Sequence, residues 1–96
     1  MDELNKIKNE LRRMKPELVE RFHVNSIGLF GSVVRNDFTE KSDIDIIVDF
    51  TEPIGIAFID LADLLETTLK RPVDLVSRNG VKAKYLNVIQ SEIEYV

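Results

Sequence analysis

Three short apolar runs, each bounded by turn-forming residues, most constrain how this 96-residue chain can fold. They cover residues 26–30, 44–50 and 73–76, and the second run is the richest in β-branched side chains. Apolar runs of this length with such flanks are typical of buried strands. The sequence therefore predicts three strands.

Segments of helical pattern lie before, between and after these runs. Apolar residues spaced three and four apart predict helices over residues 2–22, 56–70 and from Val81 onward. The first helix is expected to kink or break near Lys15, because Pro16 cannot donate a backbone hydrogen bond.

A further short helix is expected after Gly31, and Tyr95-Val96 is expected to trail away extended. The order αβαβαβα predicts one α/β (α+β) domain over residues 1–96, with a small mixed three-stranded sheet flanked by helices.

Polar residues at the strand ends predict how the strands are arranged. Gly31 ends the first strand and Asp43 begins the second, so they share an edge only if these strands are antiparallel. The helix over residues 56–70 is long enough to carry the chain back, which makes the third strand parallel to the second. Asp74 is then expected near Asp43 and Asp45.

Composition excludes several classes of function. The chain has no cysteine, so disulfides and thiolate metal sites are excluded, and a metal must be bound by oxygen or by the single His23. A net charge of −4 argues against a nucleic-acid partner, which requires a positive surface. No apolar run is long enough to span a bilayer, and the charged first residues do not resemble a signal peptide. We therefore expect a cytoplasmic protein with no membrane role.

Asp43 and Asp45 are the first candidate site residues. Side chains two positions apart on a strand point to the same face, so both carboxylates are expected to project together. Clustered anions repel unless a cation lies between them, and carboxylate oxygens suit magnesium or manganese. The alternative is that Asp43 belongs to a turn cap and Asp45 is a solvated strand-edge residue.

Gly31 and Ser32 form the second candidate feature. A glycine after a buried strand lets the backbone approach a ligand closely, and Ser32 is expected to cap the short helix that follows. Backbone N–H groups there could meet phosphate oxygens, and Arg35 lies one turn further on the same helical side. The chain lacks the glycine-rich loop of P-loop NTPases. An ordinary strand-to-helix turn with a surface arginine is the alternative.

Asp74 is the third candidate, because a carboxylate in an otherwise apolar strand is costly unless it is solvated or bound. Its alternative is an exposed strand-end residue. Three other residues are assigned ordinary roles: Lys41 is expected to face solvent, Phe38 to anchor packing, and His23 to be a surface or packing residue.

Together, residues 31–35 (GSVVR), 42–45 (SDID) and 73–76 (VDLV) resemble the DNA polymerase β-like nucleotidyltransferase superfamily. They look most like its minimal nucleotidyltransferase (MNT) branch, and the resemblance extends from the first strand to the C-terminal helix. Two positions depart from the family pattern: Val34 and Asn36 stand where the family often has alanine and glycine. Asparagine tolerates a left-handed backbone better than most residues, so the turn is expected to survive.

The resemblance implies transfer of a nucleoside monophosphate, AMP from ATP, to an acceptor hydroxyl with release of pyrophosphate. Asp43 and Asp45 would hold a metal ion, and Asp74 would complete a second metal position with them. Two Mg²⁺ ions are implied, with Mn²⁺ as an alternative. Ser32 and the Gly31-Ser32 backbone would bind the outer phosphates, with Arg35 bracing the loop.

Minimal members of this branch commonly act as antitoxins of small helical HEPN ribonuclease toxins. The resemblance therefore implies a HEPN-type partner, a tyrosine hydroxyl as acceptor and adenylylation as the modification. A non-catalytic module that neutralises its partner by occlusion is the alternative, and transfer to an aminoglycoside would require an acceptor domain that this sequence lacks. Homo- and hetero-oligomers are both compatible with the sequence.

Overall fold

The computed structural model describes residues 3–96 and contains a four-stranded sheet in the order β3-β2-β1-β4. The strands are β1 (Val24–Phe30), β2 (Ile44–Phe50), β3 (Val73–Ser77) and β4 (Glu94–Tyr95). The helices are α1 (Glu3–Phe22), α2 (Ser32–Arg35), α3 (Ala57–Leu69) and α4 (Ala83–Ile89), with short 3₁₀ turns η1 (Arg78–Gly80) and η2 (Gln90–Glu92).

The predicted strand directions are confirmed. β1 pairs with β2 in antiparallel fashion, and β2 pairs with β3 in parallel fashion, so the sheet is mixed. Helix α3 makes the crossover from β2 to β3. It ends at Lys70, which adopts a left-handed conformation (φ 59°), and Pro72 follows.

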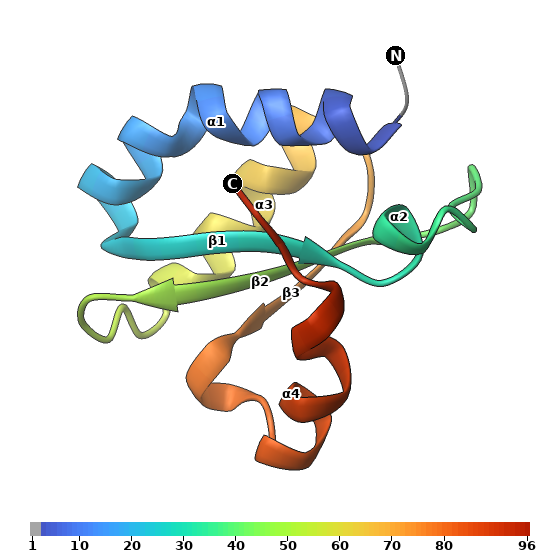
Figure 1. Ribbon diagram of the computed structural model, residues 1–96. Coiled ribbons are helices and arrows are strands. Elements are labelled where there is room, and N and C mark those ends of the chain that lie inside the picture. Colours follow the sequence, from blue (N-terminus) through green and yellow to red (C-terminus); the bar gives the residue numbers. More distant parts are fainter. Residues whose placement is uncertain (1–2) are drawn as a thin grey trace.

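Helices α1 and α3 cover one face of the sheet, and α4 lies on the other (Figure 1). The main core lies between the sheet and helices α1 and α3. It includes alternate residues of β2, because side chains on a strand point to opposite faces in turn. Its fully buried members include Leu11, Leu18, Ile27, Leu29, Ile44, Ile46, Leu61 and Leu65.

A second, smaller cluster fills the opposite face. Phe30, Ile47 and Ile89 are buried there, and Leu86 and Ile93 pack against them. Asp45 and Asp49 flank Ile47 on β2 and share its face. The carboxylate of Asp45 therefore lies on the face covered in part by the C-terminal segment.

The sheet has one strand more than the three expected. Tyr95, which was expected to trail away extended with Val96, instead forms β4 together with Glu94, and this strand pairs Gly28 with Tyr95 and Leu29 with Glu94. The Val96 N–H donates to the Ile27 carbonyl at 2.9 Å and continues this pairing. A two-residue strand carries too little periodicity to be recognised in a sequence.

Of the kink or break expected near Lys15, the break is wrong, because α1 continues through Pro16. Proline leaves the carbonyl of Arg12 without its helical donor, but both residues are exposed and water can solvate that carbonyl. Met14 and Leu18 are buried on either side of the proline and hold both turns against the core. Among residues 3–96, no helix combines the length and the apolar character needed to cross a membrane.

Candidate functional site

Gly31 turns the chain from β1 into α2 at the centre of the candidate site. Its backbone has φ 78° and ψ −150°, a region that side chains rarely adopt. A Cβ atom at this position would lie 2.0 Å from Oδ2 of Asp45, so the backbone and the carboxylate are in close contact. The close approach to a ligand expected at Gly31 stays a prediction, and the group that its backbone contacts here is the side chain of Asp45.

Two details of this turn bear on the sequence predictions. Gly31 takes the N-cap position and Ser32 is the first helical residue, so the expected Ser32 cap is wrong. The glycine conformation starts α2 one residue earlier than a serine cap would. Asn36 adopts the left-handed conformation expected of it, with φ 71°, and ends the helix.

The three predicted carboxylates come together along neighbouring strands. Asp45 is in register with Phe30 of β1 on one side and with Asp74 of β3 on the other. Asp43 lies two positions before Asp45 and is exposed, as is Asp74. The topology predicted for these residues is therefore confirmed, and the Gly31 turn lies beside them.

Asp45 has the electrostatic character of a crowded site. Burial, followed by the charges of Asp74 and Asp43, raises the pKa of Asp45 from 3.8 to about 6. Arg35 opposes this rise and Glu92 adds to it. A carboxyl with a pKa raised by like charges favours either a proton or a cation.

The carboxylates are neighbours without forming a closed ligand set. Within residues 3–96, no group of three or more histidine, aspartate or glutamate side chains has the geometry to hold a metal ion. Oxygen atoms from another source would have to complete the coordination of a cation at Asp45.

Arg35 is held by carboxylates of two different segments. Its Nη1 donates to Glu92 Oε1 at 3.2 Å, and its Nε lies 3.8 Å from Asp37 Oδ2. The same Oε1 atom of Glu92 accepts a hydrogen bond from the Gly31 N–H at 3.0 Å. Arg35 and the Gly31 turn therefore share one anchor, which comes from the C-terminal end of the chain.

The family model for the nucleotidyltransferase domain matches residues 4–96. The chain belongs to the nucleotidyltransferase domain family. It is similar to the protein adenylyltransferase MntA of Thermococcus cleftensis, with 44% identity over 94 residues, which is 97% of this chain and 95% of that protein. The family and the enzyme class predicted from the three motifs are confirmed.

Solved structures agree with this assignment. A structure described as a minimal nucleotidyltransferase superposes with a TM-score of 0.80 and 29% identity, covering 98% of this chain and 95% of that one. A toxin–antitoxin structure with AMP-PNP matches with a TM-score of 0.71 and 28% identity, covering 97% and 71%. A complex of a tri-AMPylated Shewanella oneidensis HEPN toxin with MNT antitoxin matches with a TM-score of 0.62 and 28% identity, covering 96% of this chain and 66% of that one.

Two residues of this nucleotidyltransferase contact the site and were not predicted from the sequence. One is Glu92, and the other is Arg71, whose Nη2 donates to the carbonyls of Thr39 and Ser42 at 2.8 and 3.0 Å. The Arg71 guanidinium also lies over the ring of Phe38, 4.4 Å from its centroid. Arg71 thereby ties the loop before Asp43 to the segment before β3, and Phe38 is a packing residue as predicted.

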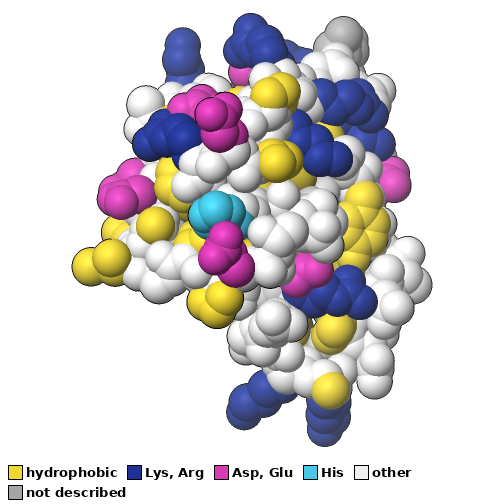
Figure 2. Space-filling view, turned by 90° about the vertical axis from the view of Figure 1, so that its left-hand side faces the viewer, with side chains coloured by type: hydrophobic (Ala, Val, Ile, Leu, Met, Phe, Trp, Pro, Cys, Tyr) yellow, Lys and Arg dark blue, Asp and Glu magenta, His cyan; other side chains and the backbone are white. Residues whose placement is uncertain are grey.

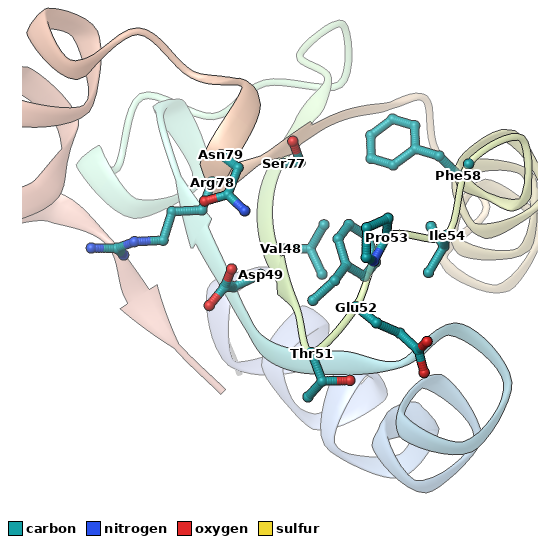
Figure 3. Close-up of a pocket in the computed structure, with 12 residues that line it drawn as sticks. Val48, Asp49, Thr51, Glu52, Pro53, Ile54, Phe58, Ser77, Arg78 and Asn79 are labelled. Carbon is teal, nitrogen blue, oxygen red and sulfur yellow. The ribbon is translucent and has the colours of Figure 1, made fainter.

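A pocket of the nucleotidyltransferase lies away from these carboxylates. A cavity of about 550 Å³ is found at the far end of β2, lined by Val48, Phe50, Pro53 and Ser77 among others (Figure 3). None of the predicted site residues lines it. The carboxylates of Asp43 and Asp45 instead lie at the opposite end of β2, where the strand begins.

His23 lies away from the candidate site, as expected of a surface residue. It is exposed where α1 meets β1, and its Nδ1 lies 3.2 Å from Glu52 Oε1. In Figure 2 the single histidine of the sequence, coloured cyan, lies on the face turned to the viewer, beside an acidic side chain. It takes no part in the cluster of carboxylates.

Proposed function

We propose that this chain is a protein adenylyltransferase that transfers AMP from ATP to a tyrosine hydroxyl of a HEPN-type toxin and so acts as its antitoxin. The observation that carries the proposal is the contact of the Gly31 turn with Asp45, which lies directly beside Asp74 in the sheet. In the proposal, the Gly31 turn binds phosphate groups beside this pair of carboxylates. Similarity to an MntA protein adenylyltransferase and to complexes with AMP-PNP and with an AMPylated HEPN toxin supports the choice of nucleotide and acceptor.

The donor atoms fit a divalent cation. Asp43, Asp45 and Asp74 would hold Mg²⁺, with two ions and Mn²⁺ as possibilities, because hard cations prefer carboxylate oxygens. Burial, and after it the charges of Asp74 and Asp43, raises the pKa of Asp45, and a bound cation would favour its ionised form. Because the described side chains of residues 3–96 form no complete ligand set, we propose that phosphate oxygens of the nucleotide complete it. When bound, the cation would neutralise charge on the phosphates.

In the proposed reaction, the tyrosine oxygen bonds to the α-phosphorus of ATP. The bond from that phosphorus to the oxygen bridging to the β-phosphate breaks, and pyrophosphate leaves with the electron pair. The hydroxyl proton passes to Asp74, whose side chain is exposed. Ser32 and the backbone of the Gly31 turn orient the outer phosphates.

The open position of the site suits a protein acceptor. Asp43 and Asp74 are exposed and lie outside the large cavity, so a side chain presented on another protein can reach them. An acceptor hydroxyl on a folded partner needs such access more than it needs an enclosed pocket. This separates the proposed acceptor from small molecules that enzymes enclose.

Incubation with labelled ATP, Mg²⁺ and the HEPN-type partner tests the proposal. The wild type is expected to label the partner, and a Tyr→Phe partner variant should stay unlabelled. Asp43→Asn/Asp45→Asn in this chain should abolish labelling, because removal of two ligand charges removes the metal position. No metal-dependent label on any partner would contradict the enzymatic proposal.

The occlusion alternative predicts a different result. The double variant Asp43→Asn/Asp45→Asn would then protect cells from the toxin as well as the wild type does, while still binding it. Equal protection would leave the chain as a neutralising binder whose carboxylates are vestigial.

A further inference from the structure

Glu92 connects the C-terminal segment to the candidate active site across 61 positions of sequence. Its carboxylate accepts one hydrogen bond from the backbone N–H of Gly31 at 3.0 Å and another from Arg35 Nη1 at 3.2 Å. Its side chain is only 23% exposed, less than half the exposed fraction of Arg35 at 52%. These contacts make Glu92 the shared anchor of the Gly31 turn and of the Arg35 guanidinium.

We propose that Glu92 is a positioning residue, which holds the Gly31 turn and Arg35 in the arrangement that receives the phosphates of the nucleotide. This inference rests on the proposed function. Gly31 has no side chain to limit its backbone, and its buried N–H needs an acceptor when no ligand is bound. Glu92 supplies that acceptor.

Arg35 also depends on Glu92 for its orientation. Asp37, which follows α2, attracts the same guanidinium at 3.8 Å. Without Glu92, the half-exposed Arg35 side chain would be free to follow Asp37 alone. With Glu92 in place, the guanidinium stays next to the Gly31 turn, because both donate to the same Oε1 atom.

The alternative is that Glu92 acts as a gate. Its carboxylate would then compete with phosphate for the Gly31 N–H and would have to withdraw before the nucleotide binds. The packing around Glu92 favours a fixed brace. Ile93 next to it lies so close to β1 that a Cβ on Gly28 would be 2.8 Å from its Cγ2 atom. Glu94 then pairs with Leu29 in the sheet. Withdrawing Glu92, as a gate requires, would strain this pairing and the second core. A brace needs no such movement.

Binding of AMP-PNP with Mg²⁺, measured by calorimetry without any partner protein, tests the proposal. Glu92→Ala is expected to weaken binding about tenfold, the effect of losing a charge-assisted hydrogen bond. Glu92→Gln should lose less, because its amide oxygen can still accept from the Gly31 N–H. Glu17→Ala is the matched control, since Glu17 pairs with Arg21 on the exposed side of α1 and should leave binding unchanged.

Amide hydrogen exchange of Gly31, followed by NMR in the ligand-free chain, gives a readout that does not depend on nucleotide. Exchange should be faster in Glu92→Ala than in the wild type, and intermediate in Glu92→Gln. Unchanged or tighter AMP-PNP binding in both Glu92 variants would overturn the brace and favour a gate. If Glu92→Ala does not fold, Glu92→Gln decides alone. Failure of the wild type to bind AMP-PNP would instead contradict the proposed function, while Gly31 exchange would still test the anchor.

Discussion

At the scale of single residues, the site depends on positions where one atom more or less changes the geometry. Gly31 is the clearest example, because its backbone conformation and its contact with Asp45 both exclude a side chain. Asp45 is the second, because its carboxylate is partly buried and interacts with the charges of Asp74 and Asp43. Both were identified from the sequence, whereas their direct contact was not, since it depends on the register of β1 with β2.

Gly31→Ala should therefore cost both stability and activity. Positive φ alone costs about 1 kcal/mol for a residue with a Cβ, and the collision with Asp45 adds to it. Gly55→Ala is the matched control, because Gly55 has φ 57° but nothing within 4 Å of its added Cβ. In urea unfolding, Gly31→Ala should lose more stability than Gly55→Ala, and only Gly31→Ala should lose adenylylation. Equal losses would argue against a tight contact at Asp45.

Asp45→Asn should stabilise the fold at neutral pH while removing activity. The pKa of Asp45 is about 6 in the folded state and 3.8 as the ordinary value. The folded state thus binds the proton more tightly, and its stability falls as pH rises from about 4 to about 6. Above that range, the variant should be more stable than the wild type by about 1–2 kcal/mol, a figure reduced because water partly screens the group.

Urea unfolding at pH 4 and pH 7.5 measures this effect. The difference between Asp45→Asn and the wild type should nearly vanish at pH 4, where Asp45 is protonated in most molecules. Asp63→Asn, at an exposed position of α3, is the control and should change stability by less than about 0.5 kcal/mol at both pH values. A destabilised Asp45→Asn at pH 7.5 would contradict the crowding of charges.

At the scale of elements, the alternation of strands and helices and the directions of the main strands could be predicted. They follow from the spacing of apolar residues along the sequence and from the length of the helix between β2 and β3. The contact of Arg71 with Thr39, 32 positions away, could not be predicted, because an arginine in a sequence gives no sign of which carbonyl it contacts. The same holds for Glu92.

Arg71→Ala should loosen the loop before Asp43 with little loss of global stability. The variant removes two hydrogen bonds to loop carbonyls and the contact with Phe38. We expect faster amide exchange over residues 39–43 and about tenfold lower kcat/KM, because loosened positioning raises the barrier. Arg12→Ala, which removes only an exposed contact with Asn9 on α1, is the control. Unchanged exchange in Arg71→Ala would show that the loop is held by other contacts.

At the scale of the whole molecule, the two faces of the sheet have different tasks. The face under α1 and α3 (Figure 1) holds most of the buried apolar residues, and the other face combines the small second core with the carboxylate of Asp45. The burial of Asp45 and the neighbouring charges of Asp74 and Asp43 lower stability there, so ligands that neutralise these charges should stabilise the fold as a whole.

Mg²⁺ together with AMP-PNP should raise the Tm of the wild type more than either does alone, because the described carboxylates do not form a complete ligand set. A ligand at 100 times its Kd adds about 2.7 kcal/mol, or roughly 10 °C or more for a domain of this size. EDTA should reverse the shift. Asp43→Asn/Asp45→Asn should show no shift of its own Tm, and a full shift in this variant would exclude these aspartates as ligands.

The two-residue strand β4 also affects how this molecule meets its neighbours. A long exposed edge strand offers unpaired N–H and C=O groups to any passing chain and so invites fibrils. Here one edge of the sheet ends in a strand of only two residues, Glu94 and Tyr95, with a charge on the first. Little main-chain hydrogen bonding is left to extend on that side, so the fold discourages uncontrolled stacking of copies.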